Sequence, residues 1–155
     1  MKLKILWPGK TRNREIQGLQ EFYLERINRI ERCELVQTKV ARGIAERFAD
    51  RIKKIEALGL EKHLKDGYII CLFHGGREMN SAEFAQFLER LASSSSRAIT
   101  FVAGGFLGLE KRILKRADFL LSLSQMTFSH ESIRIMLLEQ IYRSLTIMKG
   151  TQYAK

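Results

Sequence analysis

The amino-acid sequence predicts an α/β fold, a single domain with a mostly parallel sheet and helices on both of its faces. Segments with the apolar pattern of strands alternate with segments of helical spacing along the whole chain. The run Tyr68–Phe73 is almost entirely apolar, as in a central strand that is buried on both faces. The 155 residues suffice for one compact domain and are too few for two ordinary ones, so residues 1–155 are taken as one unit.

Two strands and two helices are expected in the first part of the chain. Lys2–Trp7 has the pattern of a strand, and apolar residues at helical spacing then predict a helix over roughly residues 12–31. Glu34–Val40 alternates enough for a second strand. A further helical stripe runs from Ile44 to Leu58, and Gly59 is expected to interrupt or end that helix.

The second part continues the alternation. Asn80–Glu83 has the pattern of a capping box, which predicts the start of a third helix. Ala98–Ala103 and Phe119–Leu123 are expected to be the fourth and fifth strands. A basic helix is expected between them, around Leu109–Ala117.

The last helix should run from about His130 to Lys149, with Ser129 placed as its N-cap. Its apolar residues cover more than one face, which exceeds the single stripe that a core needs. The surplus face is expected to pack against a second subunit.

Three loops are expected at the carboxyl ends of the strands, where open parallel sheets bind ligands: residues 73–80, 104–108 and 124–130. The second loop contains Gly104-Gly105-x-x-Gly108, and glycine lets a ligand approach the backbone closely. A plain strand-to-helix turn explains these glycines equally well. A nicotinamide-binding fingerprint is disfavoured, because Ala103 stands where its first glycine should be.

Charge is the one unusual feature of the composition. The chain has 27 Lys and Arg residues against 17 Asp and Glu residues, a net charge of +10. This excess favours a polyanionic partner such as nucleic acid, although basic proteins without that role are also common.

Several other classes of protein are disfavoured. The apolar runs fall far short of the ~20 residues that a membrane span needs. The histidines and cysteines lack the spacing of metal ligands, and there is neither a nucleophile elbow nor a P-loop. Cys33 and Cys71 form no C-x-x-C motif, which is typical of a reduced, cytosolic protein.

Three features of the C-terminal third occur together: the glycine loop, the motif S-L-S-x-M-T-F-x-H at residues 122–130, and Arg134 followed by L-E-Q-I-Y-R at residues 138–143. In this combination they resemble the ribosomal RNA large-subunit methyltransferase H family, which belongs to the SPOUT class. The resemblance extends along the whole chain and includes residues 8–10 and 81–85.

The resemblance implies a small α/β methyltransferase whose C-terminal part is tied in a trefoil knot. It implies S-adenosylmethionine as the cofactor and N3 of a pseudouridine in helix 69 of 23S rRNA, within the assembled ribosome, as the methyl acceptor. It also implies a cytoplasmic homodimer with each active site at the subunit interface. No metal and no membrane partner are expected.

The family's motifs also imply roles for individual residues. The cofactor should contact Leu72, Phe73, Gly105, Ser124, Gln125, Met126, Thr127, Phe128 and Ser129. The rRNA phosphates should be positioned by Lys10, Arg12, Arg14, Arg77, Lys111 and Arg112. The candidate catalytic residues are Arg134, Tyr153 and Lys155.

The chain departs from the family's pattern at three positions. Family members usually end in Tyr-His-Lys or Tyr-His-Arg, whereas this chain ends in Tyr153-Ala154-Lys155. Ser129 replaces the proline before the loop histidine, and Phe73 stands where an acidic residue is often found. Ala154 supports a second hypothesis, a ribosome- or RNA-binding protein of the same fold with weak or no methyltransferase activity.

Overall fold

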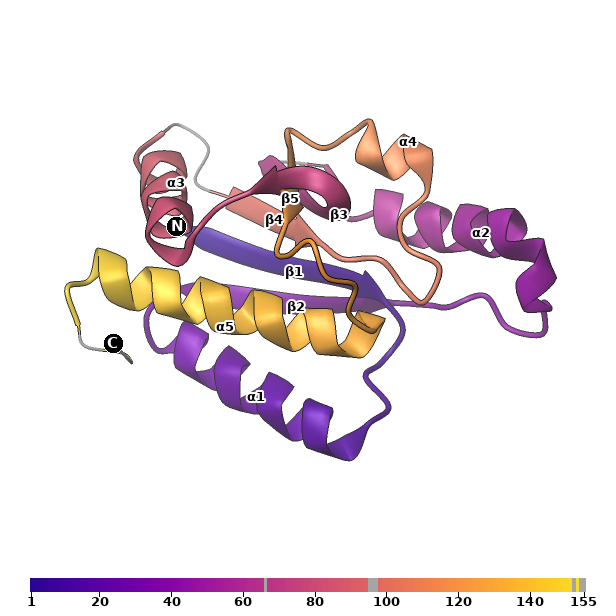
Figure 1. Ribbon diagram of the computed structural model, residues 1–155, viewed down its shortest axis with the longest axis horizontal. Coiled ribbons are helices and arrows are strands. Elements are labelled where there is room, and N and C mark those ends of the chain that lie inside the picture. Colours follow the sequence, from indigo (N-terminus) through magenta and orange to yellow (C-terminus); the bar gives the residue numbers. More distant parts are fainter. Residues whose placement is uncertain (66, 95–97, 152, 154–155) are drawn as a thin grey trace.

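The computed structural model describes residues 1–65, 67–94, 98–151 and 153. It contains a five-stranded parallel sheet in the order β2-β1-β4-β3-β5, with helices on both faces (Figure 1). The α/β prediction is therefore confirmed. The strands are β1 (Lys2–Pro8), β2 (Arg32–Thr38), β3 (Tyr68–Glu78), β4 (Ala98–Val102) and β5 (Phe119–Ser122).

One face of the sheet is covered by α1 (Arg14–Asn28), α3 (Ser81–Ser93) and α5 (His130–Met148), with α5 packed against the other two helices. The opposite face carries α2 (Ala49–Glu61), which follows a single 3₁₀ turn, and the short α4 (Lys111–Leu114). The strands alternate their side chains between two cores, because successive residues of a strand point to opposite faces. In β1, for example, Ile5 and Trp7 enter the first core and Leu6 enters the second.

The helix starts follow the capping pattern of the sequence. Asn80 and Glu83 exchange both hydrogen bonds of a capping box, with N···O distances of 2.9 and 2.8 Å. The Ser129 hydroxyl accepts a hydrogen bond from the Ser132 N–H at the start of α5. Both predicted caps are confirmed.

β3 is longer than expected, since residues 73–78 belong to the strand and not to a loop. The strand pairs with β5 at residues 70–72 and again at residues 77–78, and its register shifts between Leu72 and Arg77. Gly76 lies so close to β5 that an added Cβ would be 2.7 Å from the Leu120 carbonyl group. Residues 73–78 therefore continue the strand, because Gly76 lets the two backbones approach closely. The apolar run of the sequence ends at Phe73 and could not reveal this extension.

The second helix was predicted incorrectly in three ways. It begins at Ala49, not near Ile44, and Gly59 lies inside it. Leu58, expected on the core face, is exposed, and the buried face is formed by Glu56, Ala57 and Leu60. Gly59 is placed where the helix crosses β2, because an added Cβ would be 3.3 Å from Cβ of Thr38.

The basic helix is also shorter than expected, with four residues instead of Leu109–Ala117. Glu110 caps it by accepting a hydrogen bond from the Arg112 N–H, and the chain must soon turn into β5. Of the four consecutive serines at residues 93–96, Ser93 ends α3, and residues 95 and 96 lie outside the described residues.

We expect Gly76→Ala to lower the free energy of unfolding by roughly 1–3 kcal/mol, because the new methyl group would force β3 away from β5. Gly18→Ala is the matched control. Gly18 lies within α1, nothing is within 4 Å of an added Cβ, and the change should stabilise the protein by about 0.5–1 kcal/mol. Urea denaturation measures both values, and equal stability of Gly76→Ala and the wild type would contradict the proposed packing.

Candidate active site

Two adjoining cavities open at the carboxyl edge of the sheet. The smaller one, with a volume of about 320 Å³, is lined mainly by three segments: residues 72–74, residues 103–109, and residues 121–128 without Gln125. The first segment lies within β3, the second follows β4, and the third begins at the end of β5; these three strands are neighbours in the sheet. The sheet topology thus brings together the three regions that the strand ends indicated, although the first contributes strand residues.

Seven of the nine predicted cofactor residues line this smaller cavity: Leu72, Phe73, Gly105, Ser124, Met126, Thr127 and Phe128. The other two do not. The Gln125 amide donates a hydrogen bond to Glu78 at 3.2 Å, and Ser129 caps α5.

The glycine loop folds back on itself between the two cavities. The Gly108 N–H donates a hydrogen bond to the Gly105 carbonyl at 3.0 Å, and Gly108 has a φ of +78°, in the left-handed region. A Cβ on Gly104 would lie 2.6 Å from the Gly108 carbonyl carbon. Only glycine permits this turn, which leaves backbone groups accessible to a ligand.

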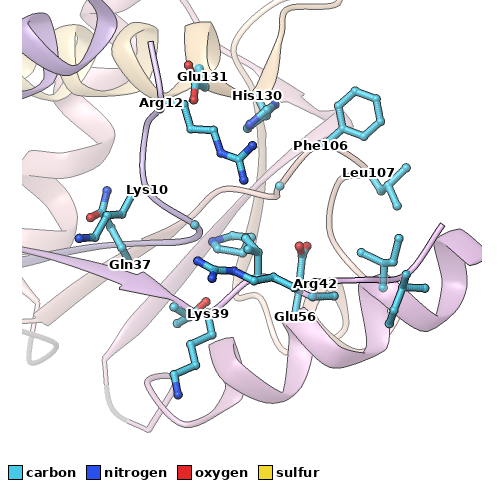
Figure 2. Close-up of a pocket in the computed structure, with 18 of the residues that line it drawn as sticks. Lys10, Arg12, Gln37, Lys39, Arg42, Glu56, Phe106, Leu107, His130 and Glu131 are labelled. Atoms are coloured by element: carbon cyan, nitrogen blue, oxygen red, sulfur yellow. Dashed lines mark hydrogen bonds between the residues drawn. The ribbon is translucent and has the colours of Figure 1, made fainter. Parts of the chain in front are cut away.

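The larger cavity has a volume of about 1030 Å³ and shares Gly105, Phe106, Leu107 and His130 with the smaller one. Besides the buried Arg134, four cationic side chains line it: Lys10, Arg12, Lys39 and Arg42. Figure 2 shows them arriving from the loop after β1 and from the segment after β2. The chemistry of the two cavities therefore differs, and the glycine loop is the wall between them.

The sequence did not single out Lys39 and Arg42. They lie after β2, the edge strand next to β1, so the parallel arrangement brings them to the same end of the sheet as Lys10. A strand-end rule applied to the second strand would have found them.

The remaining predicted RNA-binding residues lie outside both cavities. Arg14 and Arg77 are exposed, and Lys111 begins α4. Arg112 is engaged within the protein, because its guanidinium forms ion pairs with Glu110 at 3.1 Å and Glu61 at 3.5 Å.

Glu131 fastens the basic loop after β1 to the start of α5. Its carboxylate accepts hydrogen bonds from the backbone N–H groups of Arg12, at 2.6 Å, and Asn13, at 3.1 Å. Burial alone would raise the pKa of Glu131, but these hydrogen bonds outweigh it and leave the pKa below its ordinary value. The loop that carries Lys10 and Arg12 is therefore held in place.

Arg134 lines the larger cavity, although only 1% of its surface is exposed. Its guanidinium donates hydrogen bonds to the Pro8 carbonyl at 2.7 Å and the Thr11 hydroxyl at 3.3 Å, and it stacks over Trp7. Burial lowers its pKa to about 10, which still leaves it charged at neutral pH. These contacts position the turn after β1.

His130 stands at the junction of the two cavities, with its ring edge-on to Phe106 at a centroid distance of 6.2 Å. Burial, followed by the charge of Arg134, lowers the pKa of His130. Its imidazole is therefore neutral at physiological pH.

Tyr153 lies at the other end of α5. Its hydroxyl is 3.5 Å from that of Tyr23, and its ring packs against Tyr142 at a centroid distance of 4.6 Å. Because a helix of 19 residues is roughly 28 Å long, α5 separates Tyr153 from the cavities of its own chain. Lys155 and Ala154 lie outside the described residues.

Two further properties concern the described part of the chain alone. It contains no cluster of three or more His, Cys, Asp or Glu side chains placed to hold a metal. None of its helices has the length and apolar character of a membrane span.

Comparisons with known proteins agree along the whole chain. The family model described as "Predicted SPOUT methyltransferase" matches residues 1–154. Ribosomal RNA large subunit methyltransferase H of Clostridium beijerinckii is 36% identical, with 100% of both chains covered. The protein of the same name from Nitratidesulfovibrio vulgaris is 40% identical, with 97% of this chain and 96% of the relative covered.

Solved structures share the fold at low sequence identity. A probable methylase family protein from Haemophilus influenzae has a TM-score of 0.60 and 11% identity, covering 99% of this chain and 70% of its own. A putative methyltransferase from Legionella pneumophila, solved with bound SAM, has a TM-score of 0.54 and 13% identity, covering 91% of this chain and 65% of its own.

We expect Gly105→Val to abolish binding of S-adenosylmethionine in a protein that stays folded. An added Cβ would lie 3.0 Å from a Glu56 carboxylate oxygen and 3.1 Å from Pro8, so the loop between the cavities must move. Calorimetry measures the affinity, and Gly18→Ala, on the exposed side of α1, should retain it. Unchanged affinity in folded Gly105→Val would place the cofactor elsewhere.

Proposed function

Because the chain belongs to the SPOUT methyltransferase family, we propose that it methylates N3 of a pseudouridine in helix 69 of 23S rRNA, in the assembled ribosome. The names of its curated relatives support a substrate in the large ribosomal subunit. The observation that carries the proposal is the pair of cavities that meet at the glycine loop and His130. One suits a nucleoside cofactor and the other suits a nucleotide of a polyanion.

The smaller cavity fits S-adenosylmethionine in size and in the character of its walls. Its volume of about 320 Å³ is at the lower end of ligand sites, and apolar residues and the glycine loop contribute much of its lining. The tight glycine turn forms a cradle that side chains would fill. Leu72, Phe73, Gly105, Ser124 and residues 126–128 would hold the cofactor, which supplies an electrophilic methyl group when it is bound.

The larger cavity suits the RNA. Lys10, Arg12, Lys39 and Arg42 would bind phosphates around the target nucleotide, since such contacts fix the position of a nucleic acid without reading its sequence. Arg14, Arg77 and Lys111 would extend this surface, with Arg112 contributing less because of its ion pairs. His130, beside Phe106, would lie next to the acceptor where the two cavities meet.

Arg134 acts as a positioning residue in this proposal, because its contacts hold the turn that carries Lys10. Tyr153 and Lys155 act in trans, since Tyr153 is a helix length away from its own cavities. This arrangement needs the cytoplasmic homodimer that the family resemblance implies. The same resemblance implies a trefoil knot in the C-terminal part.

A patch on α1 and α5 supports the dimer. Leu19 and Phe22 on α1 are 47% and 43% exposed, and Met136 on α5 is 43% exposed, although both helices pack against each other. Such apolar residues on adjacent helices are typical of a symmetric interface.

We expect the protein to transfer labelled methyl groups to ribosomes that lack the helix 69 methyl group. Arg12→Gln should weaken ribosome binding and reduce the salt slope by about one. Arg29→Gln, which removes an exposed charge paired with Glu25, should leave both unchanged. Ribosome binding without methyl transfer would favour the RNA-binding hypothesis that Ala154 suggests.

Light scattering should find a species of twice 18.0 kDa at micromolar concentration. Met136→Lys should dissociate it, because burial of an unpaired charge is costly. The dissociated protein should bind S-adenosylmethionine and fail in methyl transfer. Phe48→Lys, at an exposed apolar residue before α2, should remain dimeric. A monomeric wild type would contradict the proposed interface.

A further inference from the structure

Glu56 is a buried carboxylate inside the larger cavity. It lies on α2 with 8% of its surface exposed, and Figure 2 shows it rising from the helix into the cavity. Among the described residues it has neither a hydrogen-bond partner nor an ion pair within 4 Å, in contrast to Glu131. Buried polar groups are normally satisfied, so an open carboxylate facing a cavity calls for an explanation.

Glu56 lies beside the wall between the two cavities. Its Oε2 atom faces Gly105, where an added Cβ would be only 3.0 Å away. Gly105 lines both cavities, so a ligand reaching from the larger cavity toward the smaller one passes this carboxylate.

Arg134 does not satisfy Glu56 directly, because its donors reach Pro8 and Thr11. Burial raises the pKa of Glu56, and the charge of Arg134 opposes this effect. A carboxylate with a raised pKa is a stronger base once it is ionised. The other charged or titratable side chains around the cavities are Lys10, Arg12, Lys39, Arg42, Glu46, Lys53, His74, His130 and Glu131.

We propose that Glu56 is the general base that accepts the N3 proton of the target base. This inference rests on the proposed function, because N3 of a pseudouridine carries a proton that must leave before or during methyl transfer. A carboxylate accepts protons and cannot donate one while ionised, and Glu56 is the open carboxylate at the wall shared with the cofactor cavity.

The step balances in atoms and electrons. The N3–H bond breaks, and its proton passes to a Glu56 oxygen while the electron pair remains on nitrogen. That pair forms the bond from N3 to the methyl carbon as the carbon–sulfur bond breaks, and the electrons of the broken bond stay on sulfur. The neutral carboxyl group then returns its proton to solvent.

A structural role for Glu56 makes a different prediction. If its charge only offsets that of buried Arg134, its removal should lower stability and slow transfer by the same factor at every pH. A general base is needed only where N3 is protonated. Its loss should therefore matter at neutral pH and become unimportant at alkaline pH, where N3 ionises without help.

The test compares single-turnover methyl transfer to ribosomes by wild type, Glu56→Gln and Glu56→Asp across pH. We expect Glu56→Gln to be slower by ~10²–10⁴-fold at neutral pH, with log rate rising about one unit per pH unit toward the wild-type value. Glu56→Asp should be slower than wild type and keep the flat neutral profile, because it retains a carboxylate. Affinity for S-adenosylmethionine, measured by calorimetry, should change less than about twofold, since Glu56 faces the acceptor cavity.

Asp50→Asn is the matched control, because Asp50 is an exposed acid on the same helix and lines neither cavity. It should behave as the wild type. A wild-type rate for Glu56→Gln at neutral pH, or a pH-independent decrease, would overturn the inference. Inactivity of the wild type would instead refute the proposed function.

Carboxyl NMR on protein labelled with ¹³C-glutamate provides a readout that needs no turnover. The signal that Glu56→Gln removes should titrate above the ordinary glutamate pKa, and addition of S-adenosylmethionine should leave it able to ionise. If Glu56→Gln proves unfolded, the pH profile of methyl transfer by Glu56→Asp decides the question. A log rate that rises with pH in Glu56→Asp, as expected for Glu56→Gln, would contradict a carboxylate base.

Discussion

The hydrogen bond from buried Arg134 to the Pro8 carbonyl is the contact on which the candidate site depends. It joins the end of β1 to α5, and the second hydrogen bond to Thr11 continues the attachment along the turn. Glu131, one helical turn earlier, holds the next two backbone N–H groups. Through these contacts a loop rich in basic residues becomes a fixed wall of the larger cavity. A buried guanidinium is costly, but the carbonyl, the hydroxyl and the face of Trp7 replace much of its hydration.

The glycine loop also lets two cavities of unlike chemistry share a wall. Gly104 packs against Gly108, and Gly105 faces Pro8 and Glu56, so side chains are excluded on both sides. A methyl donor on one side and an acceptor on the other would then meet at close range. Proximity of this kind is the principal contribution that a protein can make when the reactive group belongs to the cofactor.

The arrangement also explains why the basic residues differ in how much each contributes to the positive charge around the larger cavity. Lys10, Lys39 and Arg42 come from the ends of neighbouring strands and converge on one cavity, whereas Arg112 lies outside both cavities and is held by two carboxylates. A net charge of +10 therefore describes a field around the molecule, and only part of it surrounds the cavity. A sequence motif likewise does not show which site its residues reach. Tyr153 lies near Tyr23, away from the cavities of its own chain, and only a second chain would bring a cavity near it.

The sequence by itself determined the alternation of strands and helices, the caps at Asn80 and Ser129, and the family, because these depend on local patterns and on a joint spacing of residues. It also indicated most of the residues that line the smaller cavity, since the ends of parallel strands meet at one edge. The tertiary structure decided the rest. Gly59 lies inside α2 at the point where the helix crosses β2. Gly76 lies inside β3 at the point where the backbone of β5 comes close. Glu56, Lys39 and Arg42 reach the site through packing between segments distant in the chain, and such contacts leave no periodic trace in the sequence.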